Sequence, residues 1–227
     1  MIKEAISFFK NRNFYLPPFG YWTKKDWLKH KGETQEIFYV RLGWDVTDFG
    51  FNDFPHVGRT IFTLRNGHSR ITRYSKKYCQ KIMYLQEEQK SPIHFHRNKM
   101  EDIINHGGGN ILVQLWQADN MDKLSQKNLT VSLDGSRATV KSGKILRLTP
   151  GESICITPGT FHQFWAEISS GPVLSMEISS VNDDLHDNIW LNTATRFPQI
   201  EEDVPIEYFL CSDYQKIKNY KFEKCTT

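Results

Sequence analysis

The sequence lacks long apolar runs, a marked excess of charge of either sign, and internal repeats. No segment approaches the roughly 20 apolar residues that cross a bilayer. Its 29 Lys and Arg residues nearly balance 26 Asp and Glu residues, for a net charge of +3. Such a balance argues against a protein dedicated to nucleic acid or to a membrane surface. Linkers and low-complexity tracts are missing too, so we expect a single domain over residues 1–227.

Cysteine is scarce, and none of the four occupies a CxxC motif (Cys79, Cys155, Cys211 and Cys225). A chain of this length does not need disulfides, so we expect reduced thiols. Charges at Lys3, Glu4, Lys10 and Arg12 interrupt any signal-peptide hydrophobic region. We therefore expect a cytoplasmic protein.

The residues that are present predict an all-β body. From about residue 60, short β-branched and aromatic segments follow one another, separated by Gly, Pro, Asn or Asp. This pattern is typical of an antiparallel sandwich or barrel. Asp134-Gly135, between two such segments, predicts a hairpin turn. We assign the barrel to residues 59–190, a helical or irregular cover to residues 1–58, and a polar tail to residues 191–227.

The cover is expected to contain two short helices. Apolar residues between charges predict the first over residues 3–12. Thr23, with Asp26 three residues later, forms a capping pattern that predicts a second helix through about His30. Residues 37–50 are rich in aromatic and acidic side chains and predict irregular structure or short strands.

Two histidines one residue apart, His94 and His96, precede a short polar turn and Glu101. Side chains alternate between the faces of a strand, so both imidazoles share a face. The turn lets Glu101 return to that face from the next strand, and this set suits a borderline divalent cation. Taken alone, the pair is more typical of two surface histidines.

A second segment supplies a fourth ligand candidate. Residues 151–162 read as a strand, a turn at Pro158-Gly159, and a new strand entered by His162. Pro fixes φ and Gly supplies the positive φ that a tight turn needs. A ligand from such a distant strand would close a coordination sphere inside a barrel, which favours a metal site.

Together these segments resemble the two motifs of the cupin superfamily. The first motif, G-x5-HxH-x(3,4)-E-x6-G, is matched at His94, His96, Glu101 and Gly108, and the second, G-x5-PxG-x2-H-x3-N, at Gly151, Gly159 and His162. The departures are Glu88 for the leading Gly, Pro158 one place late, and Ala166 for the closing Asn. They fall on turn and flanking positions and leave all four ligand positions filled.

Longer stretches, NFYLPPFGYW, LGWDVTDFG, HFHRNKMEDIINHGGGNILVQLW and SSVNDD, are similar to the D-lyxose isomerase family of cupins. The resemblance covers nearly the whole chain. It implies a cupin-type antiparallel β-barrel (jelly roll) with a short helical N-terminal extension. It also implies a manganese-dependent homodimer that interconverts D-lyxose and D-xylulose, with D-mannose and D-fructose as a related pair.

The four ligands suit aldose–ketose isomerisation, which moves a proton between C1 and C2. A divalent cation can stabilise the charge of an enediolate. Six-coordinate Mn²⁺ would keep two positions for sugar oxygens, which favours it over closed tetrahedral zinc, although other divalent cations are possible. An enediol path and a hydride shift both stay open.

The reaction also needs a base near the C1 and C2 hydrogens. Glu177 is the first candidate, because it is central to a polar stripe on a predicted strand; a solvent-facing Glu is the alternative. Glu202, in an acidic run, is a weaker candidate and could simply be solvated. Lys99, in the turn before Glu101, could donate to a sugar oxygen or to the enediolate.

Some polar residues have weaker interpretations. Gln114 shares a predicted strand face with Asn110 and Trp116, and this face could line a sugar pocket or pack as ordinary core. Four aspartates could bond sugar hydroxyls or cap turns (Asp45, Asp48, Asp183 and Asp184).

Three other functions compete with a free-sugar isomerase. An iron dioxygenase could use the same ligands, but it favours an apolar pocket. A non-catalytic sugar-binding cupin is a second rival. An isomerase of phosphorylated sugars would need an Arg/Lys cluster that the sequence does not clearly show. We expect a small-molecule sugar as the partner, and neither nucleic acid nor a membrane.

Overall fold

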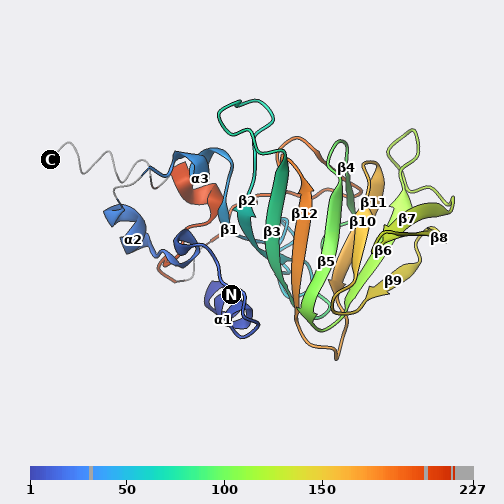
Figure 1. Ribbon diagram of the computed structural model, residues 1–227, viewed down its shortest axis with the longest axis horizontal. Helices are drawn as coiled ribbons and strands as arrows, with labels where there is room; N and C mark the ends of the chain where they lie inside the picture. The colour runs from blue at the N-terminus through green and yellow to red at the C-terminus, as the bar shows by residue number, and fades with distance from the viewer. Residues whose placement is uncertain (31–32, 202–203, 216, 218–227) are drawn as a thin grey trace.

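The computed structural model describes residues 1–30, 33–201, 204–215 and 217, and two antiparallel sheets form most of it (Figure 1). The larger sheet has the order β1 (Gly43–Thr47), β2 (Arg59–Arg65), β3 (Tyr78–Leu85), β12 (Val173–Ser180), β5 (Glu101–Gly108), β10 (Ser153–Ile156), β7 (Leu129–Leu133) and β8 (Ser136–Val140). The smaller sheet has the order β13 (Asn188–Trp190), β4 (His94–His96), β11 (Thr160–Ala166), β6 (Ile111–Gln117) and β9 (Ile145–Leu148). The fold is mostly β, as expected.

The main core lies between the two sheets. In β6, Ile111, Val113 and Leu115 are buried, while the residues between them are partly exposed. Facing side chains from the larger sheet, including Ile103 and Ile154, join the same cluster. This alternation is what a period of two produces when one face of a strand is buried.

The Asp134-Gly135 hairpin is confirmed between β7 and β8. Both residues have positive φ, 48° and 81°. A two-residue turn with both central residues in this region matches the twist of the flanking strands.

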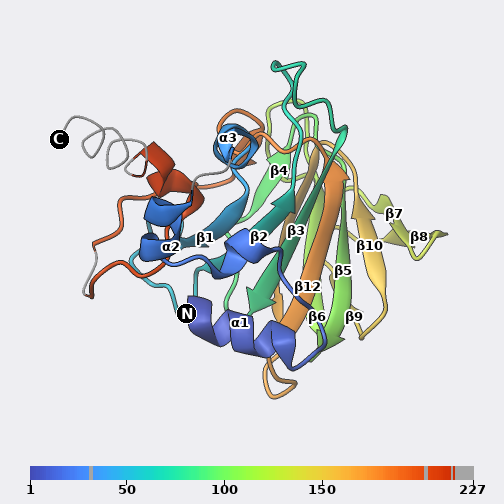
Figure 2. The ribbon, with the colours of Figure 1, turned by 60° about the vertical axis from the view of Figure 1, so that its left-hand side comes forward.

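The helices lie near the β1–β3 end of the larger sheet, and the N-terminal one packs on its outer face there (Figure 2). Helix α1 (Ile2–Lys10) buries Phe9, whose ring stacks on Trp44 with a centroid distance of 6.3 Å. A 3-10 turn, η1 (Pro18–Tyr21), links it to α2 (Lys24–Lys29). The expected cap of α2 is present, because Thr23 and Asp26 bond reciprocally. Helix α3 (Gln35–Tyr39) follows.

The first strand begins earlier than the expected start of the barrel at residue 59. Strand β1 lies within the segment assigned to the cover and pairs with β2 along its whole length. Of the two alternatives expected for residues 37–50, the short strand is therefore the one found at Gly43–Thr47, where it forms a sheet edge. Trp44 also donates from Nε1 to the Gly20 carbonyl at 2.8 Å, which ties this edge to the cover.

Part of the C-terminal tail packs back on the cover. Phe209 and Tyr214 are buried in a cluster with Trp27 of α2. The Tyr214 hydroxyl donates to the Leu42 carbonyl at 2.5 Å. This segment contains a short 3-10 turn, η2 (Cys211–Asp213). The polar composition of the tail gave no sign of this packing.

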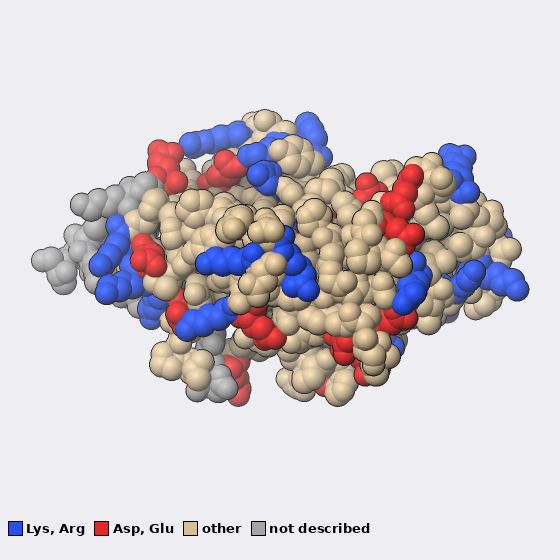
Figure 3. All heavy atoms as spheres, turned by 60° about the horizontal axis from the view of Figure 1, so that its bottom comes forward, with Lys and Arg blue, Asp and Glu red and all other residues tan. Residues whose placement is uncertain are grey.

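Charged side chains of both signs are interspersed over the face shown in Figure 3, in keeping with the small net charge. Among the described residues, no helix combines the length and the apolar character that spanning a membrane requires.

Candidate active site

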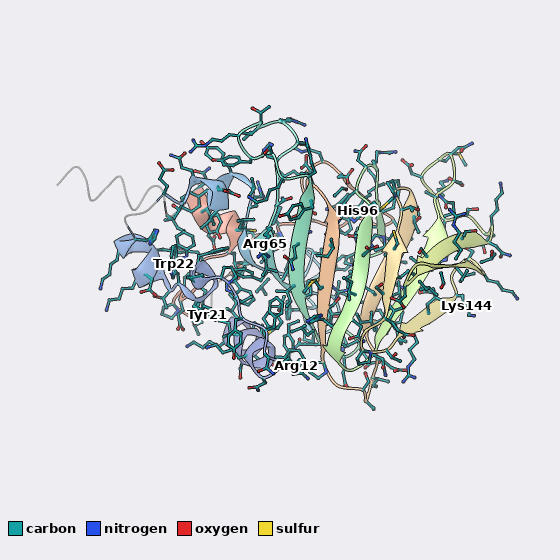
Figure 4. The ribbon with its side chains drawn as sticks, in the orientation of Figure 1. Arg12, Tyr21, Trp22, Arg65, His96 and Lys144 are labelled. Carbon is teal, nitrogen blue, oxygen red and sulfur yellow. The ribbon has the colours of Figure 1, made fainter. Side chains whose placement is uncertain are left out.

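Neighbouring strands bring three histidines together. His94 on β4 is the register partner of His162 on β11, and His96 lies on the same face of β4. One ring nitrogen from each lies within 4.8 Å of the others. His96 lies within the body of strands, away from the helical cover that carries Tyr21 and Trp22 (Figure 4). The expected period-two placement is therefore realised.

Glu101, the first residue of β5, completes the group from the opposite sheet. Its Oε1 atom lies 2.9 Å from His162 Nε2 and 3.4 Å from His96 Nε2. The side chain is 2% exposed. The structure thus brings the four predicted ligand side chains to one buried point.

Backbone carbonyls fix the tautomers of two of these rings. His94 Nδ1 lies 2.8 Å from the Pro92 carbonyl, and His162 Nδ1 lies 3.0 Å from the Thr160 carbonyl. A carbonyl oxygen only accepts, so each neutral ring carries its proton on Nδ1 and offers a lone pair at Nε2. Hydrogen bonds of this kind orient the histidine ligands of metal sites.

Because of this tautomer, the close approach of His162 and Glu101 places two hydrogen-bond acceptors against each other. Two acceptors, Nε2 and Oε1, face each other at 2.9 Å, and neither has a hydrogen-bond partner. Both nitrogens of His96 are also buried without a partner. Buried acceptors left unpaired cost free energy, and a cation among them removes that cost. The donor set of three imidazoles and one carboxylate therefore fits a divalent cation.

Burial keeps the His94 and His96 rings neutral. It lowers the pKa of His94 well below the usual 6.5, and the neighbouring His162 and His96 lower it further. Burial and then the Lys99 charge lower the pKa of His96. Burial alone would raise the pKa of Glu101, but Lys99 and His96 outweigh it and hold that pKa well below its usual range. His94, His96 and Glu101 are therefore in their ligating forms at neutral pH.

Glu177 and Lys99 lie directly beside the ligands. Glu177 occupies the inward face of β12 between Ser175 and Ser179, and all three side chains are buried. Lys99 Nζ contacts Glu177 Oε1 at 3.0 Å and Glu101 Oε2 at 2.6 Å. The structure thus brings the first base candidate and the lysine candidate into one cavity with the ligands.

With this geometry in place, comparison with known proteins decides the family. The family model of D-lyxose isomerase matches residues 1–214. The chain belongs to the D-lyxose isomerase family. This D-lyxose isomerase family member is 47% identical to the D-lyxose/D-mannose isomerase of Serratia proteamaculans over 215 residues, 94% of each chain. It is 46% identical to the enzyme of the same name from Escherichia coli O157:H7, over 96% of each chain.

Solved structures with the same fold include other sugar isomerases. L-ribose isomerase of Cellulomonas parahominis aligns with a TM-score of 0.53 at 14% identity, covering 86% of this chain and 91% of that one. The Geodermatophilus obscurus L-ribose isomerase gives 0.51 at 15% identity, covering 85% and 90%. At such identity the likeness concerns the fold alone. Membership of the family makes the protein an enzyme, an aldose–ketose isomerase of sugars.

Sequence reasoning missed a set of charged residues in this family member's cavity. Lys81 on β3 is buried and lies 3.4 Å from Glu177. Arg196, after β13, pairs with Asp45 of β1 and with Asp184 at 3.3 Å. A lysine on the apolar face of a predicted strand was the available signal for Lys81. Arg196 gave none, because its partners are remote in sequence.

An aromatic ring closes one side of the ligand group. Trp190 on β13 pairs in register with His94, and the two ring centroids lie 4.9 Å apart. Phe49 packs edge-on against Trp190 at 5.7 Å. Both aromatic residues line the cavity.

The weaker sequence interpretations have different outcomes in the structure. The sugar-pocket role of the Gln114 face is wrong, because Gln114 bonds Gly143 and Gln163 outside the barrel interior. Of the four aspartates, Asp48 and Asp183 bond turn amides as one alternative predicted, while Asp45 and Asp184 join a buried charge network that neither alternative described. Glu202 lies outside the described residues.

Proposed function

We propose that this protein interconverts D-lyxose and D-xylulose, and also D-mannose and D-fructose, as free sugars with a bound divalent cation. The names of the two bacterial relatives support these substrates. The observation that carries the cation is the buried pair of acceptors, His162 Nε2 and Glu101 Oε1, at 2.9 Å. Mn²⁺ is the preferred ion, since a six-coordinate metal with four protein ligands keeps places for two sugar oxygens.

Glu177 and Lys99 have different roles in the proton transfer. Glu177 takes the proton from C2 of the aldose and returns it to C1, while the hydroxyl proton of O2 moves to O1. The C2–H electron pair becomes the C1–C2 double bond, and the carbonyl oxygen takes the negative charge. Lys99 donates to that oxygen. The bound cation supplies positive charge that stabilises the same oxygen.

The charge of Glu177 suits a base. Burial alone would raise its pKa, but the charges of Lys81 and Lys99 outweigh burial and hold its pKa below the usual 4.5. It is therefore ionised at neutral pH and ready to accept a proton. His94, His96, Glu101 and His162 would hold the cation from one side, and Trp190 excludes water beside His94.

The charged cavity favours a free, polyhydroxylated sugar over the rivals. Lys81, Lys99 and Arg196 each pair with carboxylates, so these cations are already neutralised and offer no phosphate site. An iron dioxygenase would want an apolar pocket, and these residues make the cavity strongly polar.

The family resemblance also supports a homodimer, which sedimentation equilibrium would test. A cytoplasmic location is supported by the three described cysteines, Cys79, Cys155 and Cys211, which are all free thiols. Cell fractionation would test that location.

The direct test is to incubate the Mn²⁺-loaded protein with a panel of pentoses and hexoses. We expect D-xylulose from D-lyxose and D-fructose from D-mannose. Running the reaction in D₂O distinguishes the paths, because a proton held on Glu177 exchanges with solvent and brings deuterium to C1 of the product, whereas a hydride shift carries the C2 hydrogen to C1 without exchange. The absence of any ketose would contradict the proposed function.

A further inference from the structure

A lysine is buried where the strand pattern calls for an apolar residue. Lys81 lies on the inward face of β3 with Cys79 and Met83, and it is 4% exposed. Taking an ammonium out of water costs several kcal/mol unless carboxylates and hydrogen bonds compensate for it. The partners that compensate for the burial of Lys81 therefore indicate its role.

The partners of Lys81 are held by the strands themselves. Lys81 is the register partner of Glu177 in the β3–β12 ladder, with Nζ 3.4 Å from Glu177 Oε1. Nζ also donates to Asn182 Oδ1 at 2.7 Å and lies 3.9 Å from Asp184. Asn182 in turn exchanges two hydrogen bonds with Asn66, at 3.1 Å each. The ammonium thus has a fixed position.

All three contacts to Glu177 fall on one of its oxygens. Oε1 receives Lys99 Nζ at 3.0 Å, Ser179 Oγ at 3.0 Å, and the ammonium of Lys81. Within the described part of the chain, no hydrogen bond or ion pair engages Oε2. Since Glu177 lines the cavity beside the metal ligands, one oxygen is anchored and the other is available.

We propose that Lys81 is a positioning residue that, with Lys99 and Ser179, holds Glu177 by Oε1 so that Oε2 is the atom that accepts the substrate proton. This inference rests on the proposed function. The proton passes from C2 to Oε2 and then to C1, so no oxidant or reductant is needed. Lys99 also contacts Glu101, so it does not fix the position of Glu177 alone, and Lys81 supplies a further contact that does.

The test compares Lys81→Met with Lys81→Arg and with the control Lys76→Met. Lys76 pairs with Glu36 on the partly exposed surface. For Lys81→Met we expect kcat to fall about ten- to a hundredfold, because a misplaced reactive group is costly. KM and bound Mn²⁺ should stay unchanged, and Lys81→Arg should recover part of the rate. The isotope effect with C2-deuterated D-lyxose should rise, because proton transfer then limits turnover more fully.

A double-mutant cycle separates positioning from general damage. If Lys81 acts through Glu177, Lys81→Met lowers the residual rate of Glu177→Gln no further. Additive losses, or a wild-type kcat and isotope effect in Lys81→Met, would overturn the inference. Should Lys81→Met fail to fold, Lys81→Gln, which keeps a donor for Asn182 without the charge, replaces it under the same criteria. Normal turnover by Glu177→Gln would instead overturn Glu177 as the proposed base.

Discussion

At the scale of single residues, hydrogen-bond donors and acceptors determine the chemistry. The carbonyls of Pro92 and Thr160 accept hydrogen bonds from Nδ1–H of His94 and His162, so both rings present a lone pair at Nε2. Glu101 divides its two oxygens: Oε2 accepts from Lys99, and Oε1 faces the imidazoles. One oxygen is thereby kept for a cation.

Glu177→Gln should keep the fold and the cation but lose about 10²–10⁴-fold in kcat, because an amide cannot accept the proton. Steady-state kinetics with D-lyxose, together with metal analysis of the same sample, measure both effects. Glu167→Gln, on the partly exposed side of the Arg147 ion pair, is the matched control. A Glu177→Gln enzyme with normal kcat would remove this residue from the mechanism.

We expect Mn²⁺ to stabilise the wild-type protein and Glu101→Ala to abolish that stabilisation. A ligand at a hundredfold excess over its Kd stabilises the folded state by about 2.7 kcal/mol. Thermal unfolding with and without Mn²⁺ measures this as a shift in Tm. An equal shift in wild type and Glu101→Ala would show that the cation binds elsewhere.

The sequence predicted the convergence of the four candidate ligands better than the network around them. His94 and His96 follow from the period of one strand, and Glu177 from a polar stripe on another. Periodicity gives the faces of a strand but not its neighbours, so the pairing of Lys81 with Glu177 across β3 and β12 could not be predicted. The same holds for Arg196, whose partners lie on β1 and after β12.

At the scale of elements, the site depends on the close approach of two sheets. β4 and β11 place three histidines, while β5 and β12 place Glu101 and Glu177 opposite them. Helices α1 and α2 and the barrel strands were predicted from periodicity, capping, turn and alternation signals, whereas α3 was not predicted. Strand β1 was predicted only as one of two alternatives, because its pairing as a sheet edge depends on β2 and on contacts with α1.

Phe9→Ala in α1 should lower the free energy of unfolding by about 3–5 kcal/mol, because Phe9 is 1% exposed and leaves a cavity against Trp44. Urea denaturation measures the loss. Tyr15→Ala, at a side chain 68% exposed, should change it by less than about 0.5 kcal/mol. Equal stability of both variants would mean that α1 does not pack as described.

At the scale of the whole molecule, buried charged side chains link the cavity to neighbouring segments through ion pairs. A chain of ion pairs extends from the segment after β13 to the candidate ligand Glu101. Its members, in order, are Arg196, Asp184, Lys81, Glu177, Lys99 and Glu101. Burial raises the pKa of Asp184, but Arg196 and then Lys81 outweigh it and lower that pKa well below 3.8.

The metal-free protein should therefore lose stability in acid. The pKa values of Glu177 and Asp184 are lower in the folded state than in the unfolded chain. Below pH 4.5 the unfolded chain therefore binds protons that these two carboxylates do not bind when folded, so the free energy of unfolding falls as pH falls. Asp45, whose pKa burial raises, opposes this in part. Urea denaturation between pH 3 and 7 measures the slope, which Asp184→Asn should reduce. An equal slope in Asp184→Asn would contradict this origin.

The central claim is that four side chains hold one divalent cation on which isomerisation depends. The most direct measurement is to strip the protein with a chelator, assay D-lyxose conversion, and titrate Mn²⁺ back while counting bound ions. The account predicts no conversion in the stripped protein and full recovery at one ion per chain, with His96→Ala failing to recover. Full conversion by the stripped protein, or recovery without binding at these residues, would contradict it.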